Sequence, residues 1–163
     1  MGRKKIKRIN LGWDSKKVKM DKHYNPKIIG QNTEAQILAR FLKYGKTVLF
    51  PFGDNERYDL VVDEEGDFIR VQCKTGEYLT DIGDSFIFSS RSTNWNNGKS
   101  KNYYGQADIF AIYLRENDEV YIFKVNNCSS RQVTVRLVNY KENNVKFSNN
   151  HILQFDKKLR EYE

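Results

Sequence analysis

The chain has 163 residues, a length that suits one domain with a single hydrophobic core. Ten Tyr, ten Phe and only two Pro exclude a largely disordered, proline-rich chain. No apolar run approaches the ~20 residues needed to cross a bilayer, and no signal-peptide pattern is present, so we expect a cytoplasmic protein without a membrane partner. Cys73 and Cys128 are too few for a disulfide framework, which suits a reducing compartment.

The net charge of +7 is concentrated at the start of the chain. Residues 1–22 hold nine Lys or Arg and two Asp, and the remainder holds 19 basic residues (28 minus 9) and 19 acidic residues (21 minus 2). A basic arm on a neutral body is typical of a polyanion tether with salt-sensitive affinity, and a solvated or nuclear-targeting tail is the alternative. We expect an arm at residues 1–27, with Lys4, Lys5 and Arg8 contacting phosphates, and one domain at residues 28–163.

The first element predicted after the arm is a helix at residues 28–44, where apolar side chains recur three and four residues apart. Gly45 is its predicted C-terminal stop. The predicted buried face consists of Ile37, Leu38, Phe41 and Leu42. Residues 47–50 are β-branched or apolar and predict a strand that ends at Pro51.

The next two predicted strands, residues 58–63 and 68–75, form a hairpin around a four-residue loop at 64–67. Farther along the chain we predict strands at 85–90, 108–114, 119–125 and 132–138, a loop at 91–102, and a closing helix from about Ser148 through Ile152, Phe155, Leu159 and Tyr162. Together these elements predict a compact α/β domain with a central mixed β-sheet flanked by helices.

Three residues of the predicted hairpin converge if its loop has four residues. Asp59 then lies opposite Gln72, and Lys74 shares their face of the sheet, whereas Val71 and Cys73 point into the core. A register slip of one residue would separate them. A carboxylate, a second oxygen ligand and a lysine on adjacent strands are what Mg²⁺-dependent cleavage of phosphodiesters requires.

Gln72 supplies a neutral oxygen where a carboxylate would bind a cation better, so the site needs a further anion. Glu34 on the first helix is the best candidate. The predicted catalytic set is Glu34, Asp59, Gln72 and Lys74, in which the first three bind Mg²⁺, or Mn²⁺ as a substitute.

These residues carry a resemblance to a known group of nucleases. It rests on Glu34, on Pro-Phe-Gly-Asp-Asn-Glu-Arg-Tyr-Asp at 51–59, on Arg-Val-Gln-Cys-Lys-Thr-Gly at 70–76, and on Tyr-Gly-Gln-Ala-Asp-Ile-Phe-Ala-Ile-Tyr at 104–113. This pattern resembles the PD-(D/E)XK nuclease superfamily and, more narrowly, its group I intron-associated homing endonucleases, in which Gln commonly stands at the second acidic position. The resemblance implies a restriction-endonuclease-like core and an oligomeric, Mg²⁺-dependent enzyme that cuts both strands of a long, specific DNA site.

Several basic and aromatic side chains are predicted to contact DNA from loops beside the sheet, and the alternative is solvated charge with aromatic core anchors. They are Arg57, Arg91, Lys99, Lys101 and Tyr103. Cutting two strands requires two sites, so we expect a homodimer or a tetramer. A Holliday-junction resolvase or a restriction enzyme are alternatives on the same fold, and a non-catalytic DNA- or RNA-binding module is a third.

Overall fold

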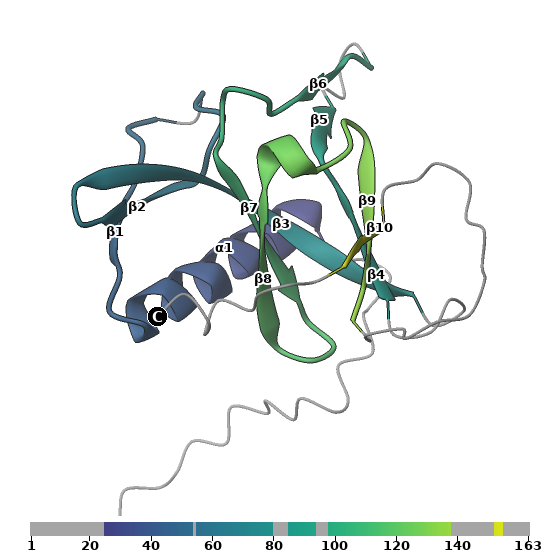
Figure 1. Cartoon of the computed structure of the whole chain (residues 1–163), viewed down its shortest axis with the longest axis horizontal. Helices are drawn as coiled ribbons and strands as arrows, with labels where there is room; N and C mark the ends of the chain where they lie inside the picture. Colours follow the sequence, from purple (N-terminus) through teal and green to yellow (C-terminus); the bar gives the residue numbers. More distant parts are fainter. Residues whose placement is uncertain (1–24, 54, 80–84, 94–97, 138–151, 155–163) are drawn as a thin grey trace, which may run out of the picture.

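The computed structural model describes residues 25–53, 55–79, 85–93 and 98–137, together with the backbone of 152–154 (Figure 1). The basic arm up to residue 24, with Lys4, Lys5 and Arg8, lies outside the described residues. So does the predicted closing helix beyond residue 154. Within the described part of the chain, no helix combines the length and the apolar character needed to cross a membrane.

The helix α1 (Pro26–Lys43) begins two residues earlier than predicted, because Asn25 caps it and Pro26 occupies its first turn. The Asn25 side chain accepts a hydrogen bond from the backbone N–H of Lys27 at 3.0 Å. Gly45, with a φ of 71°, follows the helix as the predicted stop. Ile37 and Phe41 are buried as predicted, but Leu42 is 55% exposed and does not belong to the buried face.

Eight strands form a mixed sheet, and two more form a separate ribbon. The sheet strands are β1 (Thr47–Leu49), β2 (Leu60–Glu64), β3 (Asp67–Leu79), β4 (Ser85–Ser89), β7 (Ile109–Leu114), β8 (Glu119–Lys124), β9 (Gln132–Arg136) and β10 (Ile152–Gln154). The ribbon consists of β5 (Arg91–Thr93) and β6 (Ser100–Asn102), and a 3₁₀ turn, η1 (Val125–Asn127), follows β8. The predicted fold class, a restriction-endonuclease-like core with a mixed sheet, is confirmed.

The long strand β3 is the centre of the sheet. Its first half pairs antiparallel with β2, its middle pairs parallel with β7 and its end pairs antiparallel with β4. Two cores therefore lie on opposite faces of β3. On one face α1 packs over Val71 and Cys73. On the other face β4 and β9 pack against β7 and β8 through a cluster of aromatic rings that includes Phe86, Phe110 and Tyr121.

Three local predictions need correction. The hairpin between β2 and β3 has a two-residue turn, Glu65 and Gly66, because Glu64 and Asp67 also pair; the predicted register of Asp63 opposite Phe68 is nevertheless confirmed. Both turn residues have a positive φ, as expected of a tight hairpin turn. Residues 91–102, predicted as a loop, contain the ribbon of β5 and β6. Residues 152–154, predicted as helix, are a strand that pairs in parallel with β9.

Candidate active site

Asp59 lies where β2 separates from β3. The ladder of paired residues ends at Leu60 and Val71, and the backbone N–H of Asp59 still donates to the carbonyl of Val71 at 2.8 Å. Beyond that point the Asp59 carboxylate replaces β2 along the edge of β3: its Oδ2 accepts a hydrogen bond from the Cys73 N–H at 2.7 Å. A side chain therefore satisfies a backbone donor that a longer β2 would have paired, and a carboxylate is fixed at a gap in the sheet.

Gln72 meets Asp59 as the hairpin register predicts. Its Nε2 donates to Asp59 Oδ2 at 2.5 Å, and the side chain is 8% exposed. A half turn of the amide exchanges its nitrogen and oxygen, so Gln72 also has an oxygen to offer to a cation beside Asp59. Among the described residues, both hydrogen bonds that Asp59 accepts fall on Oδ2. The second oxygen, Oδ1, is thus left for a further ligand.

Glu34 approaches the same carboxylate from α1. Its helical neighbour Thr33 is buried against β3, where its hydroxyl lies 2.6 Å from that of Thr75. Burial, and secondly the charge of Asp59, raise the pKa of Glu34. Burial also raises the pKa of Asp59, against the lowering effects of the Cys73 N–H, the Lys74 charge and the Gln72 amide. The Asp59 carboxylate is thus close enough to disfavour ionisation of Glu34.

These donors fit a divalent cation that prefers oxygen. Asp59 and Glu34 offer carboxylates with elevated proton affinity, and Gln72 offers a neutral oxygen, which together leave coordination positions for water as Mg²⁺ requires. Over the part of the chain that the structure describes, no group of three or more His, Cys, Asp or Glu side chains forms a cation cage. Such a site therefore depends on both acids. The neighbouring Cys73 thiol, whose pKa is raised well above its usual value by burial, is a packing residue.

Lys74 lies on the same strand and face as Gln72, as predicted. Its Nζ donates a hydrogen bond to the hydroxyl of Tyr103 at 3.0 Å and lies 4.8 Å from the centre of that ring. Its charge reaches Asp59, where it lowers the pKa of the carboxyl. The structure thus brings all four predicted catalytic residues to one edge of β3, with α1 on one face and Tyr103 on the other.

The side chains predicted to contact DNA fall into two groups. Tyr103 is 4% exposed and packs edge-on against Phe110 in the core, which matches the alternative of an aromatic anchor. Arg57 is held by hydrogen bonds within the protein. The remaining three belong to the ribbon and its connection: Arg91, Lys99 and Lys101. Lys99 and Lys101 are exposed there, and their contact with DNA stays a prediction.

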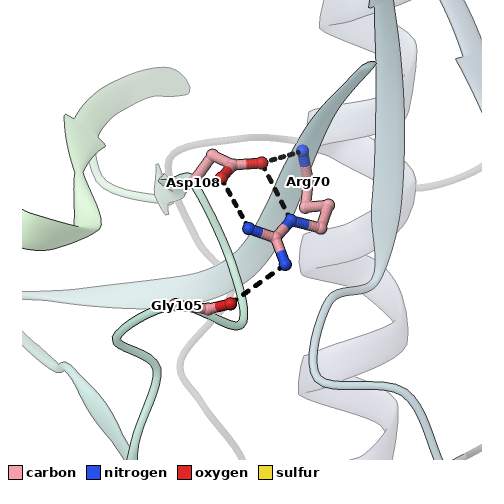
Figure 2. A network of polar contacts seen from close by, with 3 residues as sticks. All are labelled: Arg70, Gly105 and Asp108. Carbon is pink, nitrogen blue, oxygen red and sulfur yellow. Dashed lines mark hydrogen bonds and ion pairs between the residues drawn. The ribbon is translucent and has the colours of Figure 1, made fainter.

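One pair near the site was missed by the sequence reasoning. Arg70 grips Asp108 with its guanidinium, Nε to Oδ2 at 3.0 Å and Nη2 to Oδ1 at 2.8 Å, and it donates to the carbonyl of Gly105 at 3.1 Å (Figure 2). The backbone N–H of Arg70 also donates to Asp108 Oδ2 at 2.8 Å, and the backbone N–H of Asp108 donates to the carbonyl of Arg70 at 2.9 Å. This clamp joins the start of β7 to β3 next to Gln72. The sequence offered little signal for this pair: an Arg as the third residue of the predicted strand at 68–75 and an Asp as the first residue of the predicted strand at 108–114.

Comparison with known proteins decides the family. Residues 24–156 match the model of the PD-(D/E)XK endonucleases. The chain belongs to the PD-(D/E)XK endonuclease family. The predicted enzyme class, a deoxyribonuclease, is thereby confirmed, and enzymes of this family generally use divalent metal ions.

Two individual proteins are similar to this PD-(D/E)XK endonuclease. Protein 5.3 of Escherichia phage T7 is 31% identical over 91 residues, which cover 55% of this chain and 74% of the phage protein. The solved structure of a bacterial homing endonuclease, I-Ssp6803I, superposes with a TM-score of 0.62 at 25% identity and covers 76% of this chain and 86% of its own. Both similarities extend well beyond the short site motif.

Proposed function

We propose that this PD-(D/E)XK endonuclease is a Mg²⁺-dependent homing enzyme of the group I intron-associated type, which cuts double-stranded DNA at a long, specific site. The observation that carries the proposal is the position of Asp59 at the gap between β2 and β3, in hydrogen-bond contact with Gln72 and within electrostatic reach of Glu34 and Lys74. The similarity to a bacterial homing endonuclease supports the finer assignment.

Each of the four side chains has a role in this proposal. Asp59, Glu34 and the amide oxygen of Gln72 would hold the cation. When bound, Mg²⁺ supplies neutralisation of the charge that grows on the phosphate and lowers the pKa of a water molecule. Lys74 orients the attacking water or stabilises the charge on the phosphoryl oxygens, because its ammonium is held on the same face as Gln72.

DNA recognition is proposed to involve surfaces outside this cluster. Lys99 and Lys101 are exposed on the ribbon and its connection, and the basic residues 1–22 would add phosphate contacts without sequence preference. Because one such site cuts one strand, a double-strand cut requires a homodimer or a tetramer.

The test offers the purified enzyme three DNA substrates in the presence of Mg²⁺, of Mn²⁺ or of a chelator. The substrates are a duplex that carries the uninterrupted insertion site of its own reading frame, a duplex with that site scrambled, and a four-way junction. We expect cutting of both strands of the first duplex, with Mg²⁺ or Mn²⁺ only. Preferential cutting of the junction would instead assign a resolvase, and equal cutting of both duplexes would contradict a homing enzyme.

A further inference from the structure

Contacts with neighbouring residues are needed to hold the Lys74 ammonium in one position. A lysine side chain is flexible and loses considerable rotamer entropy when it is held in one place. Among the described residues, the hydrogen bond to the Tyr103 hydroxyl at 3.0 Å is the one that Lys74 donates from its side chain. The ring of Tyr103 also lies within cation–π range of the ammonium, at 4.8 Å. Both contacts come from a single residue.

Tyr103 is itself immobilised. It is 4% exposed and belongs to the core formed by β4, β7, β8 and β9. Its ring meets Phe110 edge-on, with the centroids 5.5 Å apart and the planes at 88°. Phe110 pairs with Gln72 across the parallel strands β3 and β7, so the anchor of Tyr103 is the strand neighbour of a proposed cation ligand. The hydroxyl that accepts from Lys74 therefore belongs to a ring that is held in place by the core.

Arg57 links Tyr103 and its surroundings to the loop that leads into Asp59. Its guanidinium lies 4.3 Å from the centre of the Tyr103 ring. Its nitrogens donate to the Gln106 side chain at 2.8 Å, to the Ser92 hydroxyl at 2.6 Å and to the Asn102 carbonyl at 2.8 Å. Arg57 therefore connects β5, β6 and the turn after Tyr103 to a backbone position two residues before Asp59. A guanidinium with this many protein contacts is built in, and is not a free phosphate ligand.

We propose that Tyr103 and Arg57 are positioning residues that act through Lys74. Tyr103 aims the ammonium at the cleavage site, and Arg57 holds Tyr103 against the ribbon that bears Lys101. The proposal rests on the nuclease function proposed above. Neither residue is assigned to direct contact with DNA. The contacts of Arg57 and Tyr103 connect the ribbon to the Lys74 ammonium.

The first test is Tyr103→Phe, which keeps the ring and both of its neighbours but removes the hydroxyl that accepts from Lys74. We expect single-turnover cleavage at saturating DNA to slow by about 10²-fold, the usual effect of a misplaced reacting group, with an unchanged DNA dissociation constant. The matched control is Tyr121→Phe. Tyr121 is 1% exposed in the same core, and its hydroxyl accepts from Asn117 at 2.6 Å. This control should lose stability but keep its cleavage rate.

A second readout does not depend on cleavage. An amine-reactive ester labels lysines, and mass spectrometry gives the extent at each one, with Lys46, which is paired with Glu64 at 3.0 Å, as internal reference. Labelling of Lys74 should rise several-fold in Tyr103→Phe and stay at the wild-type level in Tyr121→Phe. Arg57→Lys, which keeps a cation but loses the planar fork, should show the same two changes as Tyr103→Phe and serves if that variant does not fold.

The outcomes separate the two proposals. Slower cleavage with intact DNA binding and greater Lys74 labelling supports the positioning role. Wild-type cleavage by both Tyr103→Phe and Arg57→Lys, or Lys74 labelling that neither substitution changes, overturns it. If the wild-type protein cuts none of the DNA substrates while Lys74 labelling still rises in Tyr103→Phe, the nuclease proposal fails and the positioning of Lys74 by Tyr103 stands.

Discussion

Two acids share the edge of β3 at a cost to the folded protein. Burial raises the pKa of Asp59, although the Cys73 N–H and the Gln72 amide both bond to its carboxylate. Burial and the Asp59 charge raise the pKa of Glu34. In the proposed function a cation would bind between the two acids, and its binding would restore the stability that the metal-free protein loses through their repulsion.

The substitution Glu34→Gln tests how much the charge of Glu34 lowers the stability of the metal-free protein. A carboxyl whose folded pKa is raised stabilises the fold below its ordinary value of 4.5, and the contribution is lost as the pH rises through the higher folded value. At neutral pH the metal-free variant should therefore melt at a higher temperature than the wild type, with a free energy of unfolding larger by less than about 1 kcal/mol, because solvent reaches part of the Glu34 side chain. Thermal melts with and without Mg²⁺ check this, and the metal should stabilise the variant less. A variant that melts lower than the wild type without metal would refute it.

The four catalytic candidates could be predicted from the sequence, whereas the residues that hold them in place could not. Alternation along β3 and the register of the hairpin place Asp59, Gln72 and Lys74 together without further information. The bond between Lys74 and Tyr103 joins residues 29 positions apart, and that between Arg57 and Gln106 spans 49. Such contacts depend on how β3 and β7 pair, which no local pattern encodes.

At the scale of the elements, the parallel pairing of β3 with β7 is the step that builds the site, and the clamp of Arg70 on Asp108 fixes its start (Figure 2). Parallel strands cannot be joined by a tight turn, so their register needs contacts of this kind. The clamp also holds the carbonyl of Gly105, close to Tyr103 in the chain. It therefore orders both the strand and the turn that carry the Lys74 support.

Asp108→Asn should weaken this clamp in a pH-dependent way. The hydrogen bonds from the Arg70 side chain lower the pKa of Asp108, so the ionised carboxylate stabilises the fold above its ordinary value of 3.8, and the contribution is lost as the pH falls through the folded value. Both side chains are more than a third exposed, so we expect a loss of about 0.5–1 kcal/mol at neutral pH. Urea unfolding at several pH values measures it.

The control for the clamp is Asp118→Asn. The Asp118 carboxylate pairs with Arg40 at 2.8 Å but is 67% exposed, so its loss should change the free energy of unfolding less. A deficit in Asp108→Asn that persists unchanged below the ordinary aspartate pKa would contradict the electrostatic explanation.

Element prediction succeeded where the pattern was local. The helix with its stop at Gly45, the β2–β3 register and the four-residue loop between β7 and β8 follow from spacing and turn residues. The ribbon was missed because its polar residues have a loop-like composition. Residues 152–154 were assigned to a helix because Ile152, Phe155 and Leu159 have helical spacing, whereas pairing with β9 determines the conformation there.

At the scale of the whole molecule, the positive charge is concentrated in a segment of the chain that is separate in sequence from the candidate active site. Residues 1–22 carry a balance of +7, and the rest of the chain is neutral in sum. Most sequence-independent attraction to DNA should therefore come from this segment, and we expect the cluster at β3 to contribute mainly to cleavage.

Deletion of residues 1–22 should weaken DNA binding and flatten its dependence on salt, because fewer counterions are released from the phosphates. Dissociation constants measured at several salt concentrations give the two slopes. A variant with the same nine Lys and Arg residues changed to Gln separates charge from length and should behave like the deletion. An unaltered salt slope in either would show that the segment is no phosphate tether.

The central claim, that Asp59 and Lys74 perform the chemistry, is tested most directly by single-turnover cleavage of a bound duplex by Asp59→Ala and Lys74→Ala. Asp63→Ala and Lys46→Ala are matched controls from the same hairpin region, where Asp63 accepts from the Gly66 N–H and Lys46 pairs with Glu64. We predict that the first pair loses cleavage by on the order of 10³-fold or more while DNA binding is largely kept, and that the controls cut normally. Cutting at the wild-type rate by either Asp59→Ala or Lys74→Ala would contradict the claim.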